Sequence, residues 1–222
     1  MKRNLFVLLI LFSFVAIISG QHRIGFYAGG STNKLSGDKI QYSIYKSGPG
    51  FSTGVILDLQ IFDDVFVSIN PGYRFSSTKY LAADTITLLF KKKLEYRDSL
   101  DIRLNILNLP IFFKVLSDNH HFHVSSGIEL IYLLNTKAIY KDSRATINED
   151  SKKFNLAANF GLGYNIPVKE SNVSIELIYS QALNNWSRKD PEESYIPRVK
   201  SSGLRLLLSW QIPLKNNKKQ KP

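Results

Sequence analysis

The sequence predicts an all-β protein, an eight-stranded antiparallel up-and-down barrel that crosses a membrane. Three observations in its 222 residues predict this class. Eight segments alternate apolar and polar residues with a period of two, the signal of a strand with one apolar face. The connections between them alternate short and long. The polar face is sparsely charged, whereas the apolar face carries many aromatic residues.

The strand segments have apolar residues at nearly every second position. They cover 24–28, 51–61, 65–75, 102–115, 122–134, 154–166, 173–179 and 204–212. Most reach or exceed the roughly 9–11 residues that a tilted membrane strand needs, whereas ordinary strands average about 5–6. Ile56 breaks the alternation of its segment. In the fourth segment the apolar set changes parity at Ile106-Leu107, which predicts a β-bulge there. Pro110 favours an irregular or edge-like position nearby.

The connections predict a barrel with two unlike ends. Three are short, at 62–64, 117–121 and 167–172, and four are long and polar, at 31–48, 77–100, 135–153 and 184–200. Outer-membrane barrels have short periplasmic turns and longer external loops. Within the loop at 77–100, two stretches could extend the hairpin above the membrane.

The composition of the two strand faces separates a membrane barrel from a soluble one, which would place charges outside. Here the polar face is rich in Gly, Ser and Asn, and its isolated charges are expected to form a lumen charge network: Asp58, Arg74, Lys114, Glu129, Glu176 and Arg205. The apolar face carries candidates for the aromatic girdles of a membrane barrel: Phe26, Phe51, Phe75, Tyr132, Phe154, Tyr164, Tyr179 and Trp210. The alternative is a soluble barrel or sandwich with these aromatics in its core.

The inward set also contains large side chains, so we expect a plugged lumen. These are Tyr27, Ile56, Phe66, Ile131, Leu133 and Leu207. An eight-stranded barrel has an interior just wide enough for side chains to fill. Glycines on the same face would give them room: Gly25, Gly54, Gly72, Gly127, Gly161 and Gly163. Leu206 should face hydrocarbon, whereas Leu207 should face inward and tolerate a polar replacement better.

The chain divides into a signal peptide at 1–20, a barrel at 21–214 and a basic periplasmic tail at 215–222. Lys2 and Arg3 precede an apolar run that ends at small residues, as in secretory signals. An uncleaved signal anchor is the alternative. The expected location is the cell outer membrane. The absence of Cys excludes disulfides, zinc–thiolate sites, iron–sulfur clusters and a lipoprotein anchor.

Catalytic and cofactor chemistry is not expected. His121 and His123 would share a strand face beside His120 and Asp118, which is a possible metal pair, but a solvated turn is the favoured interpretation. The sequence has no Gly-x-Ser-x-Gly motif. We therefore predict no catalytic residue, no cofactor and no metal.

The net charge of +11 also bears on partners. Lys91-Lys92-Lys93 could meet lipopolysaccharide phosphates, so outer-membrane lipid is one expected partner and an envelope protein another. Nucleic acid is not expected, because a secreted chain rarely meets it, and the barrel is expected to be a monomer. Two function classes stay open: an interaction, structural or secretion-accessory barrel, and a narrow transport or small-solute-binding barrel.

The sequence also resembles the PorT-like outer-membrane β-barrel family, common in Bacteroidota, over nearly the whole mature chain. The segment 103–114, RLNILNLPIFFK, is similar to the family strand that ends in a Leu-polar-Ile-Pro run and a Lys. Segments 127–134, 160–164 and 175–180 resemble three later strands. The resemblance implies an eight-stranded outer-membrane barrel in a family whose named member assists a secretion system. Many such barrels finish on a terminal aromatic residue, whereas this chain runs past Trp210 into a basic tail.

Overall fold

A computed structural model describes residues 22–37, 43–83, 96–140, 143–146, 151–186 and 199–214. The predicted signal peptide, the basic tail and Lys91-Lys92-Lys93 lie outside the described residues. The strands are β1 (Arg23–Gly37), β2 (Ser43–Phe62), β3 (Val65–Ile69), β4 (Gly72–Ala83), β5 (Tyr96–Leu116), β6 (Phe122–Tyr140), β7 (Ser143–Thr146), β8 (Phe154–Val168), β9 (Ser171–Ala182) and β10 (Val199–Pro213). Within the described part, no helix has the length and apolarity to cross a bilayer.

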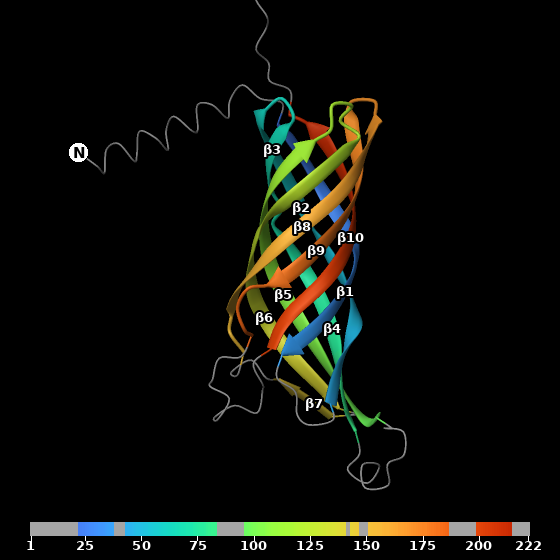
Figure 1. Cartoon of the computed structure of the whole chain (residues 1–222), viewed down its shortest axis with the longest axis vertical. Coiled ribbons are helices and arrows are strands. Elements are labelled where there is room, and N and C mark those ends of the chain that lie inside the picture. The colour runs from blue at the N-terminus through green and yellow to red at the C-terminus, as the bar shows by residue number, and fades with distance from the viewer. Residues whose placement is uncertain are drawn as a thin grey trace, which may run out of the picture.

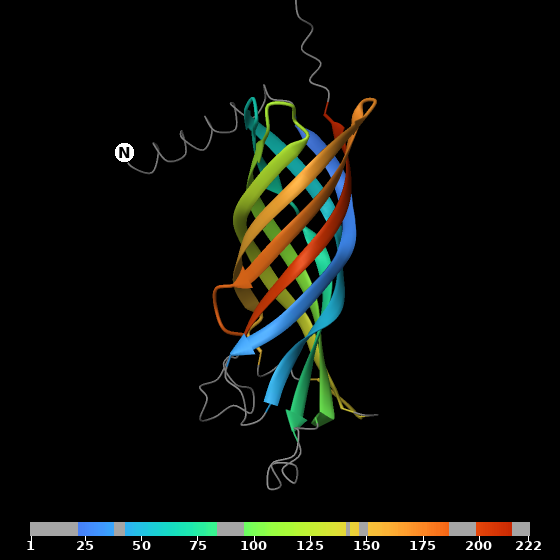
Figure 2. The same ribbon diagram turned by 45° about the vertical axis from the view of Figure 1, so that its right-hand side comes forward.

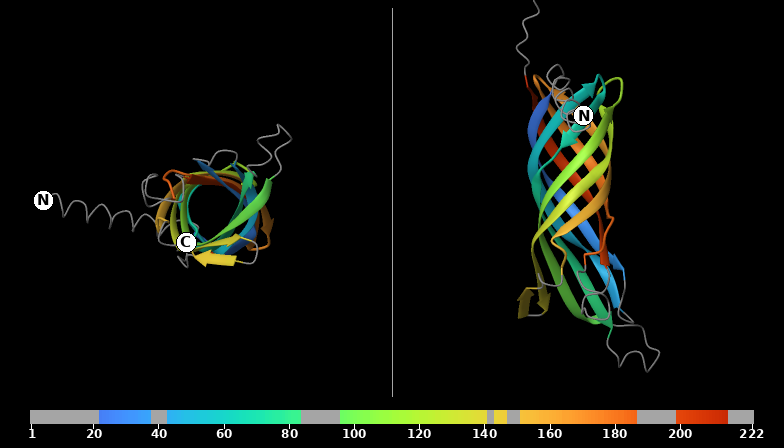
Figure 3. Two further views of the ribbon diagram at one scale, coloured as in Figure 1. Left: turned by 90° about the horizontal axis from the view of Figure 1, so that it is seen from below. Right: turned by 90° about the vertical axis from the view of Figure 1, so that its left-hand side faces the viewer.

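The strands close into one antiparallel barrel (Figures 1 and 2). Consecutive strands pair, except that β3 does not pair with β4 and β7 does not pair with β8. β1 pairs with β10 along its whole length, from Arg23–Pro213 to Gly37–Val199. The ring is visible end-on in Figure 3. β3 and β4 together occupy one strand position of the barrel, between β2 and β5, with an interruption between them. β7 pairs only with β6 and extends that hairpin. The predicted eight-stranded up-and-down barrel is therefore confirmed.

The interruption between β3 and β4 explains the position of Pro110. Asn70 and Pro71 leave the strand conformation, and the Asn70 amide donates to the Pro110 carbonyl at 3.0 Å. Proline has no backbone N–H to contribute to a ladder. Pro110 therefore lies opposite the interruption between β3 and β4, which agrees with the irregular position predicted for it.

The two ends of the barrel differ. The short turns at Asp63-Asp64, 117–121 and Lys169-Glu170 share one end, at the top of Figure 1, which we call the short-turn end. The other is the long-loop end. The predicted long loops are partly wrong, because β1, β2, β4, β5 and β6 continue well into them. For example, β4 and β5 stay paired as far as Ala83–Tyr96.

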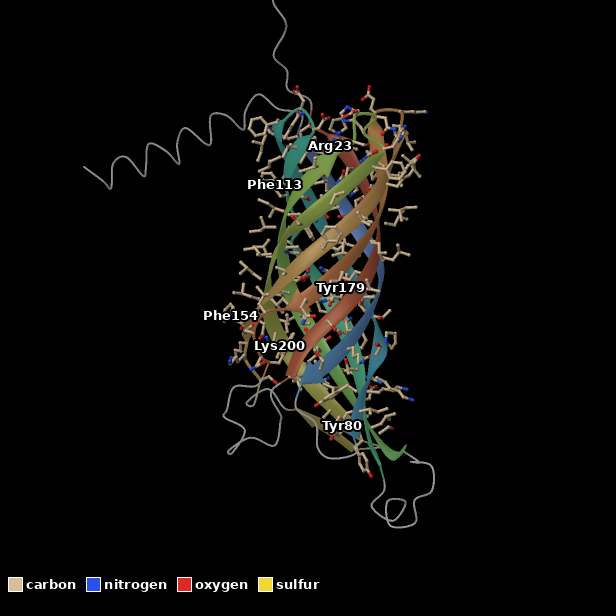
Figure 4. The ribbon with its side chains drawn as sticks, in the orientation of Figure 1. Arg23, Tyr80, Phe113, Phe154, Tyr179 and Lys200 are labelled. Carbon is tan, nitrogen blue, oxygen red and sulfur yellow. The ribbon has the colours of Figure 1, made fainter. Side chains whose placement is uncertain are left out.

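An apolar band surrounds the barrel and ends in aromatic residues on both sides, which matches the predicted girdles (Figure 4). Toward the short-turn end, Phe26 packs on Trp210 with ring centroids 5.4 Å apart. Toward the long-loop end, Tyr132 packs on Phe154 at 4.9 Å. Leu206 is 57% exposed in this band, whereas Leu207 is 6% exposed and faces the lumen. The band has the composition expected of a surface in hydrocarbon.

Beyond the band, toward the long-loop end, the two faces exchange character. In β5, Leu104 and Ile106 point inward and are buried, whereas Arg103 points outward and is exposed. The predicted β-bulge at Ile106-Leu107 is wrong in its position, because β5 keeps one parity from Leu104 to Leu116. The apolar residues of β5 change from outward-facing to inward-facing positions here because the lumen itself becomes apolar at this level.

The bulge lies one strand away, in β6. Asn105 pairs with Asn135 and Ile106 pairs with Leu133, so Leu134 is the extra residue. From this point the inward positions of β6 shift from odd to even, from Leu133 to Thr136. A second irregularity at Gly48-Pro49 shifts β2 in the same way. The bulges thus allow two strands to change facing near the edge of the apolar band.

Candidate functional site

The centre of the lumen holds a buried ionic triad formed by Arg74 of β4, Glu129 of β6 and Arg205 of β10. Arg205 donates to both oxygens of Glu129, at 2.9 Å to Oε2 and 3.3 Å to Oε1, and Arg74 lies 3.1 Å from Oε1. Glu129 is 0% exposed. Asn159 and Ser180 donate to the same carboxylate at 3.0 and 3.4 Å. Two cations and two neutral donors thus replace the hydration that this carboxylate has lost.

A second pair lies nearer the short-turn end. Lys114 of β5 donates to Asp58 of β2 at 3.2 Å, and Gln211 of β10 donates to the same oxygen at 3.1 Å. All three side chains are buried. The pair connects strands that do not touch each other at this height, because β3 lies between them. The pair therefore links β2 and β5 through the interior of the barrel.

Glu176 of β9 holds the third polar cluster. Ser125 donates to its carboxylate at 2.6 Å, and His123 Nε2 lies 3.6 Å from the same oxygen. Both partners come from β6. A Cβ on Gly163 would lie about 2.1 Å from the His123 ring, and one on Gly161 would lie 2.3 Å from Ser125 Oγ. These two glycines therefore supply the space that the cluster occupies.

Two apolar layers alternate with the polar clusters. The inner layer consists of Tyr27, Ile56, Phe112, Ile178 and Leu207. Ile56, Phe112 and Ile178 lie two residues from Asp58, Lys114 and Glu176, respectively, on the side toward the long-loop end. The layer thus separates these three charged residues from the ionic triad. Ile56, which breaks the sequence alternation, is one of its members.

The second apolar layer, the external plug, fills the lumen beyond the triad. It contains Leu35, Tyr45, Leu104, Ile106, Ile131, Leu133, Ala157, Trp186 and Val199. Trp186 comes from the connection after β9, and its Nε1 donates to Ser201 Oγ at 3.0 Å. Its backbone amide and carbonyl also bond to Val199 and Lys152. The plug is therefore tied to the ends of neighbouring strands.

All six charged residues that the sequence places in the lumen are buried there, in two groups and one isolated acid. The structure brings together Arg74, Glu129 and Arg205, then Asp58 with Lys114. Among the described pairs, Glu176 lies beside His123 and is not paired with a Lys or Arg. The alternation places His123, Ser125, Asn159 and Gln211 on the polar face of β6, β8 and β10, but the sequence interpretation did not include them in the charge network.

The structure does not bring together His121 and His123, which the sequence analysis considered as a possible metal pair. His123 points into the lumen, whereas His121 lies before β6 and stacks on Tyr164 with ring centroids 5.6 Å apart. Its Nδ1 lies 3.1 Å from the Asn165 carbonyl. His120 instead lies 3.3 Å from Asp64 across the turns. The described residues contain no cluster of three or more His, Asp or Glu side chains suited to a metal ion.

A cavity of about 540 Å³ opens at the short-turn end. It is lined by both polar and apolar side chains, among them Arg23, Phe66, His121, Lys169 and Gln211. The Arg23 guanidinium lies 5.0 Å from the centre of the Phe66 ring, in cation–π geometry. Figure 4 shows Arg23 at this mouth. Gln211, which donates to Asp58, also lines this cavity.

Several solved structures are distantly similar. The chain is 13% identical to Ail, the attachment invasion locus protein of Yersinia pestis, over 87% of this chain and 100% of that one, with a TM-score of 0.44. Neisserial surface protein A is 12% identical over 86% and 97%, with a TM-score of 0.47. The outer membrane protease OmpT of Escherichia coli is 7% identical over 87% and 97%, with a TM-score of 0.41.

The family assignment rests on a sequence model rather than on these likenesses. A search of curated proteins gives no match. The model of the outer membrane protein beta-barrel domain matches residues 19–188, most of the chain. The closed barrel, its apolar band and its polar lumen agree with that match. The chain belongs to the outer membrane protein beta-barrel domain family, and it is a protein of the outer membrane.

Proposed function

We propose that this protein is a closed, non-enzymatic barrel that acts in the cell envelope through its external end, as an interaction, structural or secretion-accessory protein. The observation that supports this proposal is the filling of the lumen. Polar clusters and apolar layers succeed one another from the Asp58–Lys114 pair to Trp186. A solute crossing the barrel would have to displace buried ion pairs as well as large apolar side chains.

Chemistry in the lumen is disfavoured by the geometry of its most suggestive residues. Ser125, His123 and Glu176 are the residue types of a hydrolase triad. However, Ser125 Oγ donates to Glu176 rather than to His123, so the histidine is not placed to take its proton. All three side chains are buried. This arrangement supports a structural role for the cluster.

The secretion-accessory form of the proposal comes only from the resemblance of segment 103–114 to PorT-like barrels, and the role of that family's named member is not carried over to this chain. The periplasmic side would then be the short-turn end, and the external side the long-loop end. We expect the external connections 77–100 and 184–200 to carry this role, and their parts 84–95 and 187–198 lie outside the described residues. Their roles are therefore inferred from the closed lumen, which leaves the outer surfaces to carry the function.

Single-channel recording in a planar bilayer tests the closed lumen. We expect no steady current from the wild-type protein, after heat-modifiable gel migration has shown that the preparation is folded. Trp186→Ala should also stay silent, because the ionic triad and the inner apolar layer remain. Steady, ion-selective openings in most wild-type insertions would contradict the proposal and favour a narrow transport barrel.

The cavity at the short-turn end supports a second candidate, the binding of a small solute from the periplasm. Arg23, His120, His121 and Lys169 around it could take an anionic group. Titration of the folded protein with small carboxylates and phosphates, followed by NMR of the histidine ring signals, tests this candidate. Saturable shifts at His120 and His121 that Arg23→Ala abolishes would favour it. The absence of saturation would leave the interaction proposal alone.

A further inference from the structure

The outer wall near the long-loop end is strongly basic. Exposed cations lie on most of its strands, at Lys34, Lys46, Lys79, Arg103, Lys137, Lys153 and Lys200. Asp101 is the one acidic residue whose side chain the structure describes on this wall. Figure 4 labels Lys200 and Tyr80, which mark this end of the barrel. Among the described residues of this end, the excess of positive charge therefore lies in the strands of the wall.

Four of these cations form a contiguous group on neighbouring strands, which we call the cationic patch: Lys46, Lys79, Arg103 and Lys137. Lys46 of β2 is the direct cross-strand partner of Lys79 of β4. Arg103 of β5 is the direct partner of Lys137 of β6. Directly opposed side chains in an antiparallel pair have Cβ atoms about 4.5–5.5 Å apart, so like charges there are destabilising. The patch contains two such pairs side by side.

Among the described residues, Asp101 is the one carboxylate within this patch. It is the direct cross-strand partner of Lys79, and it accepts from Arg103, with two guanidinium nitrogens each 3.0 Å from one carboxylate oxygen. One carboxylate thus faces four cations. Within the described part of the chain, Lys46, Lys79 and Lys137 make no ion pair. Such an arrangement is favourable when an anion from outside the protein lies over the patch.

The position of the patch identifies that anion. Its side chains point out of the barrel, and on their strands they follow the aromatic residues Phe51, Phe75 and Tyr132 toward the long-loop end. Aromatic girdles mark the boundary of the hydrocarbon. The patch therefore lies at the headgroup level of the external leaflet, which in an outer membrane carries phosphorylated lipopolysaccharide.

We propose that the cationic patch binds the phosphate groups of a lipopolysaccharide molecule in the external leaflet. Lys46 and Lys79 would neutralise one phosphate between β2 and β4, while Arg103 and Lys137 would face a second group along the wall. A guanidinium can hold a phosphate through two hydrogen bonds, whereas a lysine acts as a point charge. This site does not depend on whether the lumen conducts.

Native mass spectrometry of the detergent-folded full chain, titrated with bisphosphorylated lipid A, tests the proposal. We expect a saturable one-to-one complex with the wild type. The double variant Lys46→Gln/Lys79→Gln should bind about 30-fold more weakly, since each cation near an anionic lipid surface contributes about a factor of five. Without lipid, the same variant should resist urea at least as well as the wild type, because it loses a repulsive pair.

A matched control removes two cations from another part of the same wall. Lys153→Gln/Lys200→Gln lies on the β8–β10 side, and Lys200 faces Ser36 rather than a cation. It should bind lipid A within about threefold of the wild type. An equal loss in both double variants, or unchanged binding by Lys46→Gln/Lys79→Gln, would overturn the patch as the site.

Two further ligands separate the lipid from other anions. Dephosphorylated lipid A should bind no better to the wild type than to Lys46→Gln/Lys79→Gln. Inorganic phosphate at the same concentration as lipid A should leave the complex intact. Binding of dephosphorylated lipid A as tight as that of the bisphosphorylated form would refute phosphate recognition. Displacement by inorganic phosphate would show that the patch takes the free anion rather than the lipid.

Discussion

The part of the barrel within the apolar band and the part beyond it, toward the long-loop end, use opposite faces of the same strands. In β10, within the band, Leu206 faces outward and Arg205 inward. In β5, beyond the band, Arg103 faces outward and Leu104 inward. The backbone pairing continues through both. The medium outside the wall therefore decides which face is apolar: hydrocarbon selects an apolar exterior, and water selects an apolar interior.

The largest expected difference between the two regions concerns their acid–arginine pairs. Glu129→Ala should lower the free energy of unfolding by about 3–5 kcal/mol, because it leaves the Arg74 and Arg205 guanidiniums buried without a counter-charge. Asp101→Ala removes a partly exposed pair with Arg103 and should cost no more than about 1 kcal/mol. Urea titration in detergent measures both. Equal costs would mean that water reaches the triad.

The outer face provides the next contrast. Leu206→Arg should destabilise the barrel by about 2–4 kcal/mol, the cost of a cation near the midplane of the bilayer. Thr32→Arg, on the outer face of neighbouring β1 and closer to the cations of the long-loop end, should cost no more than about 1 kcal/mol. Equilibrium unfolding in liposomes compares the two. A smaller cost at Leu206 than at Thr32 would place the hydrocarbon at a different level of the wall.

The space made by glycine can be tested by a double variant. Gly163→Ala should cost about 1–3 kcal/mol, because its Cβ would overlap the buried His123 ring. In the His123→Ala background the same change should cost less than about 0.5 kcal/mol, since the ring is gone. Urea midpoints of the four proteins give the coupling. Additive costs would indicate that the backbone, and not the histidine, opposes the new methyl group.

The strands and the facing of the lumen charges were predictable, because the period of two is a local property of each segment. Which charges pair was not predictable. Arg205 and Glu129 are 76 residues apart, and their contact depends on the stagger between strands on different parts of the ring. A strand shows its own parity, but the stagger is a property of the closed barrel.

The sequence interpretation failed where the two regions meet. The change of apolar parity at Ile106-Leu107 indicated a bulge in β5, whereas the strand is regular and the medium around it changes. The actual bulge is at Leu134 in β6. Leu134 is apolar and faces outward like the alternate residues before it, so the hydrophobic pattern of the sequence does not reveal the extra residue. Similarly, Leu207 lies in the inner apolar layer, so Leu207→Asn should be less well tolerated than its inward position alone predicts.

The smallest expected effect locates the boundary between the regions. Leu134 follows the girdle residue Tyr132 in β6 and is 46% exposed at the bulge. Leu134→Lys should cost about 0–1 kcal/mol, because the ammonium group can reach the headgroups, whereas Leu130→Lys, four residues deeper on the same strand, should cost about 2–4 kcal/mol. Unfolding titrations in liposomes with thinner and thicker bilayers compare the two substitutions. If Leu134→Lys costs as much as Leu130→Lys, the hydrocarbon extends past Tyr132. The bulge would then lie inside the membrane, and it could not be the point at which β6 adapts to water.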